Sequence, residues 1–330
     1  MNEPINPMPL GDILDRSIKI TGATALRTLI VSAIFLIPAC LILTIGLDIF
    51  FTSIADVLRE GPAAMGSEEG MAAPMFGAVF AFMFFEILFG LGYYAAMLGN
   101  TVIACGQFEG ETITWDAAVK LAFSFRFLKA IGQYILLVLA MGAIFFLPVV
   151  FLIGGTASES GGLILLGVLG MLIAGGFVMF LAFRWYFAFT SIAWEDAGVM
   201  ESFRRSWELV RGNWWRVFGI LLLMGIVVNF ALSIILTPVY LAAFWGPISN
   251  LMQSARTMGP DIEATIQLLE SMSLRIAILV LISSLVTVMI TPVYTSVLFF
   301  DLRARAGEFK RRTPAPPPEA ATGDTEPLPL

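Results

Sequence analysis

The stretch GLILLGVLGMLIAGGFVMFLAF, residues 162–183, contains twenty-two residues and no charged side chain. A helix of this length measures about 33 Å, which is enough to cross the roughly 30 Å hydrocarbon core of a bilayer. Backbone groups find no water inside lipid, so a segment that crosses it must satisfy its own hydrogen bonds as a helix. The stretch therefore predicts a membrane-spanning helix.

The remainder of the chain has the same character. Of its 330 residues 58% are hydrophobic and only 13% are charged, whereas soluble domains carry about 25% charged residues. We predict an all-α polytopic membrane protein with a single transmembrane domain over residues 1–308. A Pro-rich tail over residues 309–330 is expected to be disordered and cytoplasmic. The six predicted spans cover residues 25–51, 75–106, 130–154, 162–194, 214–246 and 275–300.

The positions of the basic residues predict the orientation. Of the 19 Lys and Arg residues, fifteen fall on one side of the six-span topology, three fall on the other, and Arg184 lies within a span. Loops on the cytoplasmic side carry an excess of Lys and Arg. We therefore expect a multi-pass protein of the cytoplasmic (inner) membrane with both termini in the cytoplasm.

An internal repeat is suggested by two segments that align without gaps at an offset of 80. VKLAFSFRFLKAIGQY (119–134) aligns with VMESFRRSWELVRGNW (199–214), which brings Gly132 opposite Gly212. The N-terminal LGDILDRSIKITG resembles a third copy. The alignment predicts a threefold pseudo-repeat in which a cytoplasmic amphipathic helix precedes each pair of spans. Chance similarity between apolar segments is the alternative.

The third of these amphipathic helices is predicted in most detail. Apolar residues at 199, 200, 203, 207, 210 and 214 follow the spacing of one helix face, and charged residues occupy the other. We expect i,i+4 ion pairs Glu201–Arg205 and Arg204–Glu208. Asp196 is expected to cap the N-terminus and Gly212 to end the helix. A helix of this kind lies in the plane of the membrane interface.

Five arginines are candidate ligands for anionic lipid head groups. Four follow from the amphipathic segment, and the alternative for them is that they only obey the positive-inside rule. The fifth, Arg184, lies about 33 Å into its span, near the inner interface, where it can either contact a phosphate or serve as a snorkelling anchor. The candidates are Arg184, Arg204, Arg205, Arg211 and Arg216.

Two polar residues within the predicted spans support a different hypothesis. Glu86 lies about 16 Å from the outer end of its span, near the bilayer middle. With Asn229 it is a candidate for a polar intramembrane site of a transporter or permease component. The depths predict no direct ion pair between Glu86 and Arg184.

Enzyme chemistry is not indicated. The chain has no His, no Gly-rich phosphate loop followed by Lys, and no carboxylate cluster with the spacing of metal ligands. We expect no enzymatic activity, no cofactor, no metal site and no nucleic-acid partner. Cys40 and Cys105 are expected at different depths, so no disulfide is predicted.

Three stretches resemble one known family. PLGDILDRSIKI, RWYFAFTSIAWEDAGVMESFRRSWELVRGNWWRVFGILLL and FFDLRARAGEF are similar to the bacterial membrane domain that is attached to some glycerophosphodiester phosphodiesterases. In the fused proteins, catalysis belongs to a separate soluble barrel, which this chain lacks. For Arg184, Trp185, Ser206, Gly212 and Asp301, the resemblance implies a shared fold and a shared lipid context.

The expected function is therefore binding rather than catalysis. We predict a membrane module that binds or organises anionic phospholipid at the inner leaflet, or that scaffolds a partner. The expected partners are membrane lipids, with a second membrane protein or a second copy of the chain as further possibilities.

Overall fold

The fold is entirely helical in the part of the chain that the computed structural model describes, residues 6–60, 68–257 and 262–309. These residues form no β-strand. The helices are α1 (Leu10–Glu60), α3 (Glu68–Glu109), α4 (Trp115–Ala122), α5 (Phe125–Ala157), α6 (Gly161–Trp185), α7 (Ala188–Glu195), α8 (Val199–Val210), α9 (Trp214–Thr257), α10 (Ile262–Glu270) and α11 (Met272–Arg305). Nearly all of the predicted tail, from residue 310 onward, lies outside the described residues.

Six helical segments are long and apolar enough to cross a membrane, which confirms the predicted fold class. They cover Leu10–Arg59, Met75–Glu109, Phe125–Ala157, Gly161–Glu195, Trp214–Gln253 and Met272–Arg305. The first begins fifteen residues before the predicted span. The N-terminal helix and the first span are therefore continuous in α1.

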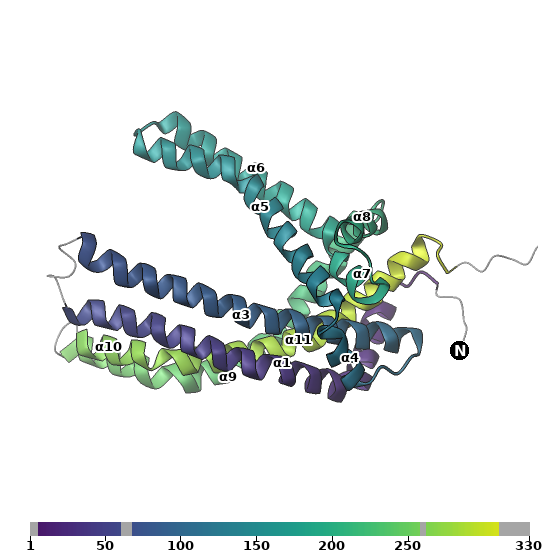
Figure 1. Cartoon of the computed structure of the whole chain (residues 1–330), viewed down its shortest axis with the longest axis horizontal. Helices are drawn as coiled ribbons and strands as arrows, with labels where there is room; N and C mark the ends of the chain where they lie inside the picture. Colours follow the sequence, from purple (N-terminus) through teal and green to yellow (C-terminus); the bar gives the residue numbers. More distant parts are fainter. Residues whose placement is uncertain (1–5, 61–67, 258–261, 310–330) are drawn as a thin grey trace, which may run out of the picture.

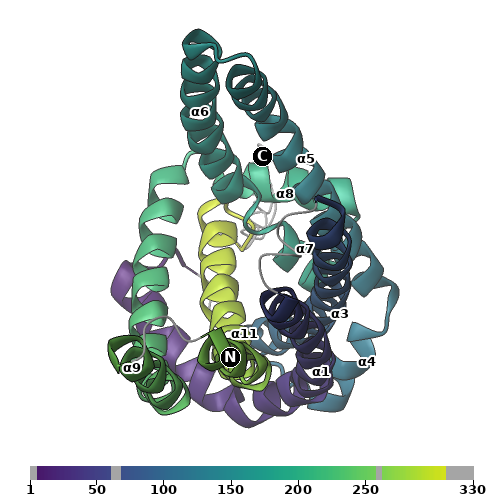
Figure 2. The ribbon, with the colours of Figure 1, turned by 90° about the vertical axis from the view of Figure 1, so that its left-hand side faces the viewer.

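The helices diverge from one end of the molecule (Figure 1). The end that contains α4, α7 and α8 is called here the α8 end, and the end that contains α10 is called the α10 end. Helices α1, α3, α9 and α11 run side by side between the two ends. The hairpin of α5 and α6 leaves the others near the α8 end and stands apart in both views (Figures 1 and 2).

Two polar contacts bracket the apolar part of α1. At the α8 end, Arg27 Nη2 donates a hydrogen bond to Gln107 Oε1 at 2.7 Å. Toward the α10 end, Ser273 Oγ donates to Asp48 Oδ1 at 3.2 Å. Twenty-one residues separate Arg27 from Asp48, which corresponds to about 32 Å of helix. This length matches the roughly 30 Å of a hydrocarbon core. The first contact, called here the Arg27 bracket, and the second, called the Asp48 bracket, therefore fit the two surfaces of a bilayer.

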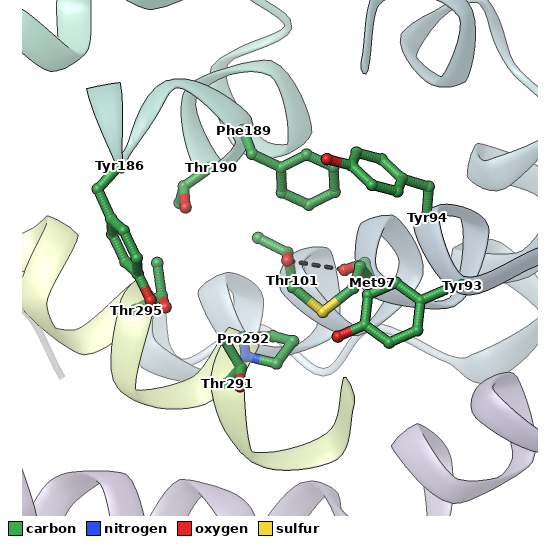
Figure 3. A pocket seen from close by; sticks show the side chains of 10 residues that line it. All are labelled: Tyr93, Tyr94, Met97, Thr101, Tyr186, Phe189, Thr190, Thr291, Pro292 and Thr295. Atoms are coloured by element: carbon green, nitrogen blue, oxygen red, sulfur yellow. Dashed lines mark hydrogen bonds between the residues drawn. The ribbon is translucent and has the colours of Figure 1, made fainter. Parts of the chain in front are cut away.

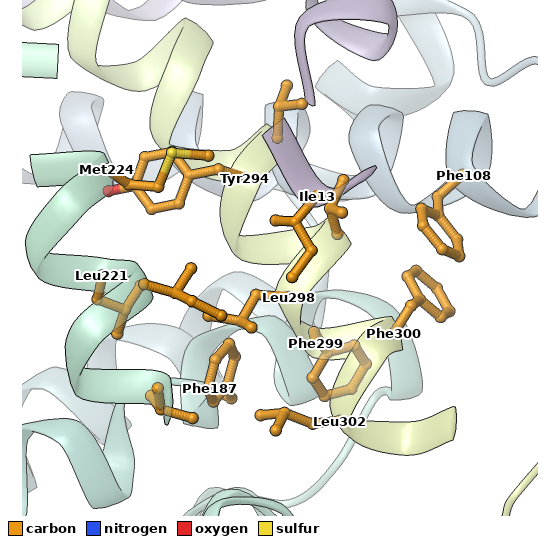
Figure 4. Close-up of a cluster of buried hydrophobic side chains, with 14 of the residues drawn as sticks. Ile13, Phe108, Phe187, Leu221, Met224, Tyr294, Leu298, Phe299, Phe300 and Leu302 are labelled. Carbon is orange, nitrogen blue, oxygen red and sulfur yellow. The ribbon is translucent and has the colours of Figure 1, made fainter. Parts of the chain in front are cut away.

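The largest hydrophobic core lies at the α8 end (Figure 4). It joins the start of α1, the end of α3, Phe187 before α7, the end of α8, the first part of α9 and the last turns of α11. Phe187, Phe299 and Phe300 are fully buried there, and the ring of Phe300 stacks on Phe108 with centroids 4.3 Å apart. The α5–α6 hairpin contrasts with this core, because Phe146 and Ile173 are each about 70% exposed.

The helix breaks do not follow the predicted repeat offset. In the order of elements, α4 precedes α5 and α6 as α8 precedes α9 and α11. However, Gly212 lies at the break between α8 and α9 with a φ of 81°, whereas Gly132 lies inside α5. The break before α5 falls at residues 123–124. The threefold repeat therefore stays a prediction.

Candidate functional site

The junction between α6 and α7 positions α8. Helix α6 ends at Trp185 and α7 begins at Ala188, so backbone groups between them lose their helical partners. Ser206 of α8 satisfies two of these groups. Its Oγ donates to the carbonyl of Arg184 at 2.8 Å and accepts a hydrogen bond from the Phe187 N–H at 3.0 Å.

The buried residues of α8 are Ser202, Ser206, Leu209 and Val210. Of the predicted apolar stripe, Met200 and Trp207 are exposed. Small serines are buried because α8 approaches the α6–α7 junction closely and bonds its backbone there.

The exposed face of α8 combines apolar and basic side chains. Met200, Arg204, Trp207 and Arg211 follow one another at intervals of three or four residues, so they lie on one side of the helix. All four are exposed. These four residues, together with Arg184 of α6, are called here the Trp207 face.

Arg184 packs on this face through its planar guanidinium. Its Cζ lies 4.5 Å from the centroid of the Trp207 ring and 5.3 Å from that of Phe180. Its Nη1 donates to the Trp207 carbonyl at 3.3 Å. Its Nε is buried and has no hydrogen-bond partner in the described part of the chain, and none of its contacts there is with a carboxylate.

Arg205 has a different environment from Arg204. Its guanidinium forms ion pairs with Glu195 at 2.9 Å and Glu308 at 2.6 Å. Arg303 pairs with the same two carboxylates, at 3.6 Å and 2.8 Å. The predicted Glu201–Arg205 pair is wrong, because Glu201 instead accepts a hydrogen bond from the Gly198 N–H. The predicted Arg204–Glu208 pair is present, with Arg204 Nε 3.9 Å from Glu208 Oε1.

The charges in this network shift the proton affinities. Burial raises the pKa of Glu308, but hydrogen bonds from Arg205 and Arg303 outweigh it, so the pKa lies below its usual value. The hydrogen bonds with Glu308 and Glu195 in turn raise the pKa of Arg205. Glu308 and Arg205 are therefore both charged at neutral pH.

A second cluster forms around Asp301, which is fully buried. Its carboxylate pairs with Arg216 at 3.2 Å and Arg305 at 3.0 Å, and it accepts a hydrogen bond from the Met8 N–H at 2.7 Å. Both arginines also donate to the Met8 carbonyl. The cluster thus joins Met8, directly before the first of the three stretches that carry the family resemblance, to Arg216 and Asp301 of the other two.

Asp196 does not cap α8, as the sequence predicted. The N-cap residue is Gly198, and Asp196 instead terminates α7 in the left-handed conformation with a φ of 57°. Its carboxylate pairs with Lys129 at 2.9 Å and Arg126 at 3.2 Å. The hydrogen bond from Lys129 lowers the pKa of Asp196. The residue therefore connects α7 to α5.

Glu86 and Asn229 lie apart from the α8 end and are both exposed. A methyl group at Gly46 would lie 2.5 Å from the Cβ of Phe85, so Phe85 is level with a residue only two positions from Asp48. This register puts Glu86 near the Asp48 bracket rather than near the middle of the apolar region, where the sequence count placed it. Asn229 donates to the Gly225 carbonyl of its own helix.

A pocket of about 230 Å³ lies between α3, the α6–α7 junction and α11 (Figure 3). Tyrosine and threonine side chains dominate its lining, and none of its lining residues is charged. Neither Glu86 nor Asn229 belongs to this lining.

The described residues contain no group of three or more Cys, Asp or Glu side chains that could hold a metal ion. Cys40 and Cys105 are both free and buried.

Sequence reasoning missed the residues that hold the arginines. Glu195 and Glu308 lie more than one hundred positions apart, so no local pattern connects them. Ser206 and Asp301 were both implicated by the family resemblance, but no pattern in the sequence indicated what either residue contacts.

These features define the class of protein, an α-helical polytopic membrane protein whose largest hydrophobic core lies at one end. The chain belongs to the family described as Domain of unknown function (DUF7847), whose family model matches residues 21–301. No curated protein and no solved structure gives a significant match. The match does not link the chain to the glycerophosphodiester phosphodiesterase membrane domain, so that resemblance stays a prediction.

Proposed function

We propose that the chain binds anionic phospholipid head groups at the inner leaflet of the cytoplasmic membrane, through the Trp207 face. The observation that carries the proposal is the position of Arg184 over the ring of Trp207, between Arg204 and Arg211 along α8. Three guanidinium groups thereby gather beside exposed apolar side chains.

The distribution of charge supports the inner leaflet. Basic residues such as Arg126, Lys129 and Arg303 gather at the α8 end, whereas Arg59 lies beyond the Asp48 bracket and Arg275 lies beside it. Cytoplasmic segments carry such an excess of basic residues. The Arg27 bracket then lies at the inner surface, on the side of the Trp207 face.

The chemistry of the face supports a phosphate ligand. Guanidinium groups bind phosphate through two parallel hydrogen bonds, and their flat surfaces stack on aromatic rings. Stacking on Trp207 holds the Arg184 guanidinium in place without using its donors in an ion pair. Met200, which is 71% exposed, suits the apolar level just below the head groups.

Two of the five predicted ligands receive less support. Arg205 and Arg216 direct their guanidinium groups at Glu195, Glu308 and Asp301. The N–H groups of these two guanidinium groups already donate to carboxylates, so they are not available to a phosphate. The proposal therefore rests on Arg184, Arg204 and Arg211.

Native mass spectrometry of the purified protein tests the proposal. In Arg184→Ala/Arg204→Ala/Arg211→Ala, the retention of phosphatidylglycerol should fall at least about tenfold, because several charge-assisted hydrogen bonds are lost. Phosphatidylcholine retention should not change. The control is Lys19→Ala/Lys120→Ala, which removes two exposed charges at the same end. Equal losses in both variants, or no loss in the first, would refute the assignment.

A further inference from the structure

The pocket between α3, the α6–α7 junction and α11 is separate from the Trp207 face. Tyr93 and Tyr94 come from α3, Tyr186 and Phe189 from the junction and α7, and Thr295 from α11 (Figure 3). The Tyr94 ring contacts Phe189 of α7 and Tyr134 of α5, with centroids 5.6 Å and 5.0 Å apart. The pocket therefore lies where the α5–α6 hairpin separates from the other long helices.

Thr295 has an unused hydroxyl group in this pocket. The residue is only 7% exposed, and its Oγ1 is buried without a hydrogen-bond partner in the described part of the chain. The Tyr186 hydroxyl lies beside it in Figure 3, and it also forms a hydrogen bond of 3.3 Å with the Tyr294 hydroxyl. By contrast, Thr101 of the same lining donates to the Met97 carbonyl at 2.7 Å.

An unpaired buried hydroxyl destabilises the empty pocket. Removing a hydroxyl from water without a replacement hydrogen bond costs about 1–3 kcal/mol. A ligand with a hydrogen-bond acceptor at this point recovers that cost. The acceptor must be uncharged, since no Lys or Arg lines the pocket to compensate a negative charge.

The depth of the pocket indicates where its ligand comes from. Thr295 is twenty-two residues from Ser273, or about 33 Å along α11, so it lies at the level of the Arg27 bracket. Tyr93 is fourteen residues from Gln107, or about 21 Å deeper along α3. The pocket thus runs from the level of the glycerol esters of one leaflet into the hydrocarbon.

We propose that this pocket binds a neutral acylglycerol, with an ester carbonyl accepting a hydrogen bond from Thr295 Oγ1. The first part of one acyl chain then lies along Met97 toward Tyr93 and Tyr94. The volume of about 230 Å³ equals that of roughly seven or eight water molecules. It accommodates an ester group and a short chain segment, while the rest of the lipid stays in the bilayer.

The ligand assignment separates this site from the proposed function. The Trp207 face selects a negative head group, whereas the pocket selects an uncharged ester. Each site is therefore tested with its own lipid, and either assignment can fail without the other.

Native mass spectrometry with added 1,2-dioleoylglycerol tests the pocket in the full chain. Thr295→Val keeps the shape of the side chain and removes the hydroxyl, so diacylglycerol retention should fall about threefold to tenfold. The matched control is Thr101→Val, which alters the same lining but removes a donor that Met97 already occupies. It should retain diacylglycerol as the original protein does.

A second variant and a second lipid complete the test. Thr291→Phe fills the pocket from a half-buried position, and it should reduce diacylglycerol retention without changing phosphatidylglycerol retention. The triple arginine variant should bind diacylglycerol normally.

The proposal is overturned if the original protein retains no diacylglycerol, or if Thr295→Val and Thr101→Val behave alike. Displacement of diacylglycerol by phosphatidylglycerol would instead identify a phospholipid chain as the occupant and overturn the neutral assignment.

Discussion

Arg204 and Arg205 are neighbours in the chain but lie on different sides of α8. Arg205 is held by Glu195 and Glu308, and its side chain is 26% exposed. Arg204 is 74% exposed and meets only Glu208, at 3.9 Å. The comparison shows that two consecutive residues of one helix have different roles. Arg205 links α8 to other segments, and Arg204 is available to a ligand.

The buried side of α8 and the Trp207 face differ in the same way. On its buried side, Ser206, Arg205 and the Asp301 cluster connect four separate segments of the chain. On the Trp207 face, the guanidinium groups have no strong partner in the described residues. Mutations on the buried side should therefore change stability, and mutations on the exposed face should change lipid binding.

The largest effect is expected at Asp301. Asp301→Ala leaves Arg216, Arg305 and the Met8 N–H without their shared acceptor in a buried site. Removal of one partner from a buried charge cluster costs about 3–5 kcal/mol. The apparent Tm in detergent should fall by many degrees, whereas Asp116→Ala, at an exposed position, should leave it nearly unchanged. A small effect at Asp301 would show that the cluster does not hold this end together.

A smaller loss is expected at Ser206. Ser206→Ala leaves the Phe187 N–H and the Arg184 carbonyl unpaired, at a cost of about 1–3 kcal/mol. Ser202→Ala is the control, since Ser202 is equally buried but donates only to Val199 within its own helix. Thermal unfolding of the two variants compares them directly. If they lose equal stability, the α6–α7 junction does not depend on Ser206.

The Glu308 network should make stability depend on pH. Because the folded-state pKa of Glu308 is lowered, its contribution is fully present above the ordinary value of 4.5 and is lost as the pH falls through the lower value. Glu308→Gln should cost about 1 kcal/mol at neutral pH. The difference in Tm from the original protein should shrink as the pH falls below 4.5. A difference that is independent of pH would contradict the ion-pair assignment.

The sequence predicted the six apolar helices because span length is a local property. It also predicted the end of α8 at Gly212, where the φ of 81° favours glycine. The sequence did not indicate that Ser202 and Ser206 are buried, because the periodicity of apolar residues does not reveal that Ser206 bonds the broken backbone at Phe187. Contacts between segments that are distant in the sequence determine which residues of α8 are buried.

The candidate site was only partly predictable for the same reason. All five arginines could be found from charge and position alone. Which of them are held by carboxylates distant in the sequence depends on Glu308 and Asp301, which lie about ninety or more residues beyond α8. The unpaired hydroxyl of Thr295 left no signal in the sequence, since threonines inside helices usually bond their own backbone, as Thr101 does.

The most direct test compares Arg204→Ala with Arg205→Ala in one experiment, by native mass spectrometry with phosphatidylglycerol and by thermal unfolding in detergent. Arg204→Ala should lower phosphatidylglycerol retention and leave the Tm unchanged. Arg205→Ala should lower the Tm and, below it, retain phosphatidylglycerol as the original protein does. If Arg205→Ala loses lipid and Arg204→Ala does not, the division between the two faces of α8 is wrong.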